Sequence, residues 1–125
     1  MVLEEWPMKE NNVIRTKSKQ FAVRIVKLNR YLIAEKQEYV LARQILRSGT
    51  SIGANVAESE YAISRNDFAL KLYIALKECN ETRYWLELLY ETEYITEEQF
   101  RSLIADCIEL QKILTAITKK VKPSR

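Results

Sequence analysis

Residues able to do chemistry are few in this chain of 125 residues. The chain has no histidine, which excludes Ser-His-Asp and Cys-His nucleophile systems and the Glu-x-x-His pairs of di-metal bundles. Glu78 and Glu81 lie one helical turn apart, where a solvent-facing pair is expected. Cys79 and Cys107 are too few for a zinc site. We therefore expect no enzymatic activity, no metal and no cofactor.

Residues 47–60 hold both glycines of the chain, yet they have the spacing of a helix. One stripe of this helix is apolar and consists of Leu41, Ile45, Ile52 and Val56. A second stripe beside it consists of Gly49, Gly53 and Ala57. Glycine in a helix costs about 1 kcal/mol relative to alanine. The small residues therefore predict a close helix contact, within the chain or between subunits.

Polar and aromatic residues at unusual places are the other candidates for a site. We expect Asn55 to join a buried polar network with Ser51 and Glu58 or with the next helix, and a ligand contact is the alternative. Tyr84 and Trp85 form an aromatic patch, which either faces a neighbouring subunit or extends the core.

The elements that position these residues are four helices, because apolar residues recur every three or four positions. The segments are 16–35, 38–62, 64–92 and a helix that opens at 96, with cap signatures at Ser64 to Asp67 and Thr96 to Gln99. They predict an all-α, antiparallel up-down-up-down four-helix bundle over residues 15–122. Residues 1–14 are expected to be a flexible N-terminal arm and residues 123–125 a tail. The bundle places Cys79 and Cys107 at similar heights as contacting thiols, a disulfide being the alternative.

Charge is unevenly distributed along the chain, whose overall net charge is +3. Residues 13–47 hold nine basic and two acidic residues, and residues 78–98 hold seven acidic and one basic. The bundle topology predicts a basic pole at one end, formed by Arg15, Lys17, Lys19, Arg65, Lys119, Lys120, Lys122 and Arg125. A basic face on the first two helices would consist of Arg24, Lys27, Arg30, Arg43 and Arg47. These cations suit phosphate contacts, and a solvated face with salt bridges is the alternative.

No apolar run approaches the roughly 18 residues of a membrane span, so the sequence predicts a soluble protein with no membrane partner. Acidic residues near the N-terminus are unlike the basic start of a signal peptide. We expect a cytoplasmic location, in which both cysteines stay reduced.

Four motifs together resemble one protein family: RSGTSIGANVAE at 47–58, SRNDF at 64–68, IALKE at 74–78 and ETRYWL at 81–86. The chain resembles the bacterial four-helix-bundle proteins encoded in intervening sequences of 23S ribosomal RNA genes. It is also similar to the accessory variability determinant of diversity-generating retroelements, a basic pentameric barrel that binds nucleic acid and a reverse transcriptase. The resemblance implies a homo-oligomer, most simply a pentamer, with RNA or DNA as a candidate partner.

Two functional hypotheses follow. The first is a non-enzymatic oligomeric bundle that offers a basic surface to RNA or DNA. The second is a protein–protein interaction scaffold that binds no nucleic acid. An enzyme would need Glu58, Asn55 and Tyr84 in one pocket, and it is the least favoured hypothesis.

Overall fold

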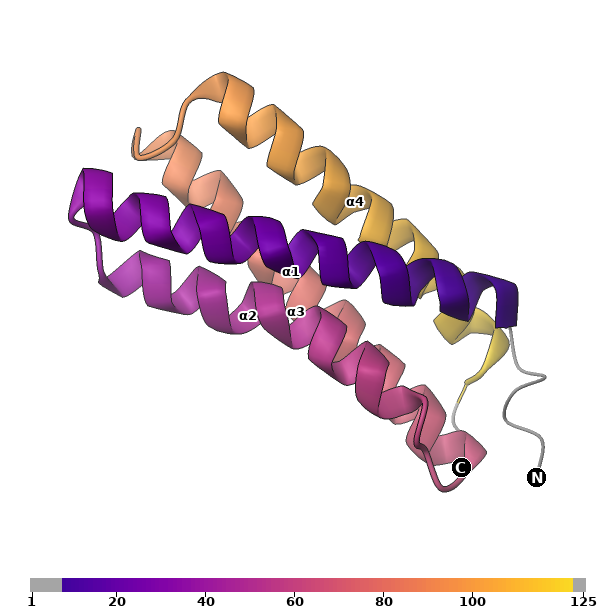
Figure 1. The fold of residues 1–125 in the computed structure, drawn as a ribbon. Coiled ribbons are helices and arrows are strands. Elements are labelled where there is room, and N and C mark those ends of the chain that lie inside the picture. Colours follow the sequence, from indigo (N-terminus) through magenta and orange to yellow (C-terminus); the bar gives the residue numbers. More distant parts are fainter. Residues whose placement is uncertain (1–7, 123–125) are drawn as a thin grey trace.

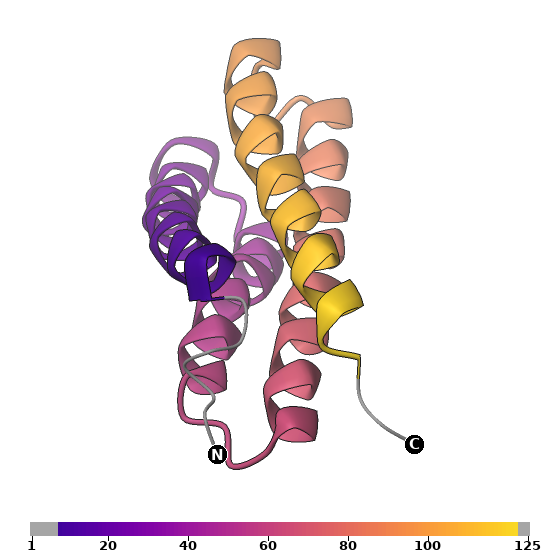
Figure 2. The ribbon, with the colours of Figure 1, turned by 90° about the vertical axis from the view of Figure 1, so that its right-hand side faces the viewer.

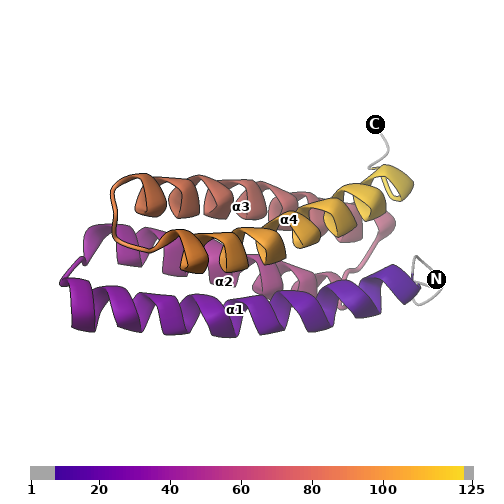
Figure 3. The same ribbon diagram turned by 90° about the horizontal axis from the view of Figure 1, so that it is seen from above.

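A computed structural model describes residues 8–122, with side chains from residue 13 onward. This range contains four helices and no strand: α1 (Met8–Lys36), α2 (Val40–Ser59), α3 (Arg65–Glu91) and α4 (Glu97–Lys120). Each helix runs antiparallel to the one before it, so the chain folds into one layered bundle (Figures 1 and 3). The predicted all-α four-helix bundle is confirmed.

The first helix begins earlier than the sequence analysis placed it. α1 starts at Met8 rather than at residue 16, because Ile14 continues the apolar stripe of Phe21 and Ile25 and is fully buried. Residues 8–14 of the expected arm are therefore helical, and Ile14 belongs to the core. Residues 1–7 and the expected tail, 123–125, lie outside the described residues.

The last two helices start at the predicted caps. The Ser64 hydroxyl accepts the backbone N–H of Asp67 at 3.0 Å, and the Asp67 carboxylate accepts the N–H of Ile63. At α4 the Thr96 hydroxyl accepts the N–H of Gln99, and the Gln99 side chain accepts the N–H of Thr96. These bonds satisfy N–H groups that a helix start leaves unpaired, which fixes where the two helices begin.

Apolar side chains from all four helices meet in one core. Cys79 and Cys107 face each other across α3 and α4 there, buried and unbridged, with their sulfur atoms 3.8 Å apart. The hydrogen bond to the Cys79 thiol, together with burial, raises the pKa of the Cys107 thiol. The predicted contact between two thiols at equal height is confirmed.

Gly49 and Gly53 let α2 approach α1 closely. A Cβ atom added to Gly49 would lie 2.8 Å from two side-chain carbons of Ile25, and one added to Gly53 would lie 3.3 Å from the backbone oxygen of Ser18. Both glycines therefore serve a helix contact inside the bundle. Ala57, the third member of the predicted stripe, is exposed.

The opposite side of α2 meets α3 through polar groups. Thr82 is fully buried, and its hydroxyl lies 2.9 Å from the hydroxyl of Ser48. Nearby, Arg47 forms ion pairs with Glu78 and Glu81. Glu78 is only 8% exposed, so the expected solvent-facing carboxylate pair is wrong, because both carboxylates turn toward Arg47.

The buried network expected around Asn55 is also wrong. The Asn55 amide donates to the backbone oxygen and the hydroxyl of Ser51, one turn earlier on the same helix, and both residues are only half-buried. Glu58 is exposed and pairs with Lys71 at 3.0 Å. That ion pair raises the pKa of Lys71.

Candidate nucleic-acid interface

The start of α1, the α2–α3 turn and the end of α4 lie at the same end of the bundle, which Figure 2 views from outside. Two contacts join these segments there. Arg15 pairs with Glu60 at the end of α2, at 3.3 Å, and Arg65 donates to the backbone oxygen of Lys120 at 3.1 Å. The topology therefore brings Arg15, Arg65, Lys119, Lys120 and Lys122 to one end, as the sequence indicated. Lys17 lies further along α1, opposite Glu109, and Lys19 lies beside Thr50 and Gly53 of α2. Arg125 lies outside the described residues.

Most cations of the basic pole face solvent. The exposed members are Arg15, Lys19, Arg65, Lys119, Lys120 and Lys122. Lys17 is half-buried and pairs with Glu109 of α4 at 3.3 Å. Backbone oxygens at the ends of α2 and α4 add negative potential at this end, which the N–H groups at the starts of α1 and α3 and the cations in the last turn of α4 offset.

The predicted basic face on α1 and α2 is not a single cluster. Arg24 turns toward α4, where it pairs with Asp106 at 2.7 Å, whereas Arg47 turns toward α3. The two side chains leave their helices on opposite flanks of the α1–α2 pair because helical position decides which neighbour each one meets. Their charge is thus matched by carboxylates of the same chain.

The other three residues of that face are exposed. Lys27 lines a hollow of about 350 Å³ between α1 and α4, together with Arg24 and Tyr31. Arg30 and Arg43 lie on the outer surfaces of α1 and α2. These cations offer charge along the side of the bundle, away from the basic pole.

Two apolar residues beside the basic pole went unnoticed in the sequence. Tyr61 and Ile63, in the α2–α3 turn, are 85% and 86% exposed. A turn is normally polar, so two large apolar residues within three positions of the Ser64 cap could have indicated an exposed apolar site. An exposed aromatic ring next to cations can stack on a base, and an exposed apolar pair can also contact another protein.

The far end of the bundle has the opposite charge. Its acidic pole consists of Glu91, Glu93, Glu97 and Glu98, all exposed around the α3–α4 turn. Glu93 has a φ of 65°, which lets the chain reverse there. A polyanion approaching the molecule is therefore attracted by one end and repelled by the other.

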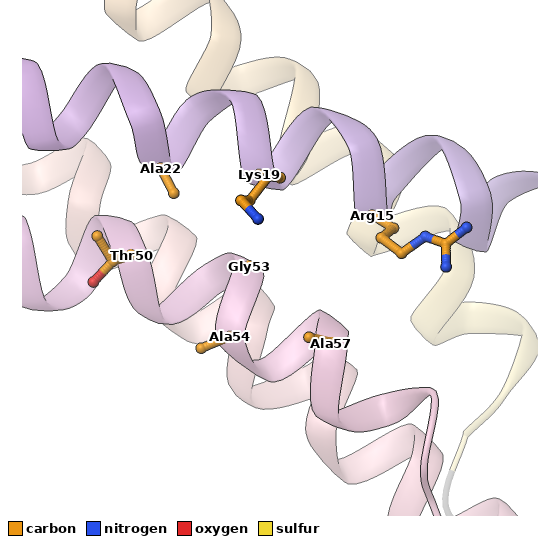
Figure 4. Close-up of a pocket in the computed structure, with 7 residues that line it drawn as sticks. All are labelled: Arg15, Lys19, Ala22, Thr50, Gly53, Ala54 and Ala57. Carbon is orange, nitrogen blue, oxygen red and sulfur yellow. The ribbon is translucent and has the colours of Figure 1, made fainter.

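A groove of about 360 Å³ runs between α1 and α2, lined by small and basic side chains (Figure 4). Its lining consists of Arg15, Lys19, Ala22, Thr50, Gly53, Ala54 and Ala57. The groove exists because Gly53 and the three alanines leave space outside the close α1–α2 contact. Its floor is apolar, and its cations come from α1.

The described residues give no other sign of a reactive centre. Between residues 13 and 122 no group of three or more histidine, cysteine or acidic side chains is placed to hold a metal ion. Across residues 8–122, no helix combines the length and apolar character needed to cross a membrane. Phosphate groups are one kind of ligand that exposed cations can contact electrostatically.

Comparison with known proteins identifies the family of the chain. Over residues 10–116 the chain matches the 23S rRNA-intervening sequence protein family. It is also similar to a crystal structure of a protein with unknown function from the S23 ribosomal protein family of Bacteroides thetaiotaomicron VPI-5482. The two are 58% identical, with a TM-score of 0.87, over 88% of this chain and 98% of that one. No curated protein matches. Because the match spans most of the chain, the protein belongs to the 23S rRNA-intervening sequence protein family.

Proposed function

We propose that this protein is a non-enzymatic, cytoplasmic homo-oligomer, a pentamer, whose basic pole binds the phosphate backbone of RNA or DNA. The observation that carries the proposal is the position of the exposed cations. Lys119 and Lys122 are exposed at one end of the bundle, where the Tyr61 ring is exposed too. Arg24 and Arg47 on the sides pair with carboxylates of their own chain, and so do Arg15 and Lys17, with Glu60 and Glu109.

Several copies are needed to make this surface effective. One chain carries a net charge of only +3 and an acidic pole that repels a polyanion. A ring of parallel copies would place the basic poles side by side on one rim and the acidic poles on the other. Avidity among five weak sites then gives useful affinity without any base-specific contact.

The direct test is binding of a fluorescently labelled RNA hairpin, followed by anisotropy at several salt concentrations. We expect the double variant Lys119→Glu, Lys122→Glu to lower affinity about tenfold or more and to flatten the salt dependence. A matched control is Lys36→Glu with Arg101→Glu, which changes the charge equally but lies toward the acidic pole. The control should bind within about twofold of the unaltered protein.

Equal losses in both double variants would show that net charge, not the basic pole, drives binding. Arg47→Glu is unsuitable for this test, although Arg47 belongs to the predicted basic face. It would place a third carboxylate beside Glu78 and Glu81 and disturb the α2–α3 contact.

A protein–protein scaffold is the second candidate function, and one observation favours it. Tyr61 and Ile63 together form an exposed apolar pair that a protein partner could cover. If RNA and DNA fail to bind at low salt while the oligomer persists, the scaffold replaces our first proposal.

A further inference from the structure

The outward surface of α3 carries a stripe that the other helices leave partly exposed, although Glu81 within it pairs with Arg47 of α2. Its positions follow steps of four and three, as in a helix that packs against a second helix: Leu70, Ile74, Lys77, Glu81, Tyr84 and Leu88. Leu70 is 53% exposed and Tyr84 is 56% exposed. The Tyr84 ring stands edge-on to the Trp85 ring, with centroids 5.0 Å apart, which widens the apolar area.

The groove between α1 and α2 has a complementary shape. Ala54 and Ala57 are exposed on its wall, and Gly53 leaves its floor open (Figure 4). Toward the acidic pole the same face continues with half-buried Val26 and Leu46. Small side chains in one surface and large ones in the other allow two helices to approach closely.

We propose that the α3 stripe of one copy packs on the α1–α2 face of a second copy of this chain. The inference rests on the oligomeric part of the proposed function and identifies the surfaces that join the copies. Because the two surfaces are different, each copy can contact one neighbour with its stripe and another with its groove. Such a head-to-tail contact closes into a ring when the rotation between copies allows it.

Heights along the bundle support this pairing. In a ring whose axis is parallel to the helices, groups at equal height face one another. The hydrogen bond from Thr82 to Ser48 places Tyr84 at the level of Leu46, since α2 and α3 are antiparallel. The Tyr84 ring of one copy therefore meets the apolar part of the next copy's α1–α2 face.

Toward the acidic pole, charges at equal height are also opposite. Extending the same antiparallel register places Glu87 of α3, which also pairs with Arg83 of the same helix at 3.5 Å, level with Arg43 of α2. The hydrogen bond from Asn29 to the backbone oxygen of Ala42 brings Arg30 of α1 to nearly the same level. Arg30 and Arg43 are exposed and would meet the acidic end of the partner's α3. This gives a role to two cations that lie away from the basic pole.

Lys77 is the one cation within the α3 stripe. The register sets it near the level of Gly53, where Lys19 also lines the groove. The proposed contact thus brings two like charges together. Lys77→Glu should lower the concentration at which the assembly half-dissociates by about threefold to tenfold.

Two blocking variants test the proposed contact through light scattering. Tyr84→Glu places a charge on the stripe, and Ala54→Arg fills the groove with a long cation. Both positions are exposed, so circular dichroism should show an unchanged bundle. Matched controls are Tyr39→Glu, where the ring is 55% exposed, and Ala105→Arg on the outer surface of α4. We expect each blocking variant to have the mass of one chain, 14.7 kDa, and each control to assemble normally.

Mixing the two blocking variants gives the sharpest result. The intact groove of the Tyr84→Glu chain can accept the intact stripe of the Ala54→Arg chain, and no further contact is possible. The mixture should therefore stop at twice the chain mass. A mixture that stays at one chain mass, or blocking variants that still assemble, would overturn the proposed contact. An unaltered protein that is itself a monomer would overturn the oligomer as well, and the RNA measurement decides separately about nucleic-acid binding.

Discussion

α2 contacts its two neighbours in different ways. Toward α1, Gly49 and Gly53 allow a close approach because they have no side chains. Toward α3, a hydroxyl pair and the ion pairs of Arg47 join the helices. The first contact depends on distance, because added atoms have no space beside Ile25. The second depends on register, because Ser48 and Thr82 bond only when they are level. One flank of α2 should therefore be sensitive to added side-chain volume, and the other to the loss of hydrogen-bond and ion-pair partners.

Adding volume on the α1 flank should have the largest effect. Gly49→Leu places a side chain where even a Cβ atom would lie 2.8 Å from Ile25, a stiff β-branched residue. We expect a loss of about 3 kcal/mol or more in the free energy of unfolding, measured by urea denaturation. Gly53→Ala is the control. Its closest contact would be 3.3 Å, and the gain in helix propensity of about 1 kcal/mol should leave stability nearly unchanged.

Removing a partner on the α3 flank should have the next largest effect. Thr82→Val keeps the shape but leaves the buried Ser48 hydroxyl without this hydrogen bond, at a cost of about 2 kcal/mol. Adding Ser48→Ala should then cost little more, and a double-mutant cycle measures that coupling. Strictly additive losses would show that the two hydroxyls do not act as a pair.

The ion pairs of Arg47 should contribute less. Its side chain is 51% exposed, and only Glu78 of its two partners is nearly buried. Arg47→Met should lower the free energy of unfolding by about 1 kcal/mol, part of which disappears in high salt. A loss as large as that of Thr82→Val would mean that the Glu78 carboxylate is held away from water more completely than its exposure indicates.

The smallest effect is expected on α1, where Arg24 contacts α4. Both side chains of the Arg24–Asp106 pair are about 40% exposed, at 38% and 43%. Asp106→Asn should change the free energy of unfolding by less than about 0.5 kcal/mol in urea denaturation. A larger loss would place the α1–α4 contact among the polar contacts that set register.

The sequence predicted the helices of the fold because a helix depends on residues that are close in the sequence. Each cap, at Ser64 and at Thr96, depends on residues within one turn. The apolar stripes of α3 and α4, which contain Cys79 and Cys107, depend on residues within a few turns. The early start of α1 was missed because residues 1–14 contain a proline and the polar run 9–12 and show no helical period, and only the burial of Ile14 shows that the helix extends there.

The candidate site was predicted less completely. Topology alone gathers the basic pole, so its residues could be named from the order of the helices. The sequence could not show which cations form ion pairs within the chain. Arg24 and Arg47 do so because their side chains leave the helix on flanks that face α4 and α3. Asn55 was misplaced because one face of α2 is not equally covered along its length. Ser48, two turns earlier on nearly the same face, is buried and bonds to Thr82, whereas Asn55 is half-buried and bonds to Ser51 of its own helix.

The two core thiols can be used to measure how often α3 and α4 separate within one chain. Cys79 and Cys107 are sealed between α3 and α4, so a thiol reagent can reach them only when these helices separate. The rate of labelling under native conditions then measures how often that separation occurs. If a neighbouring copy packs on the outer surface of α3, labelling should slow as protein concentration rises. The labelling rate of the buried thiols would then depend on a contact at the surface.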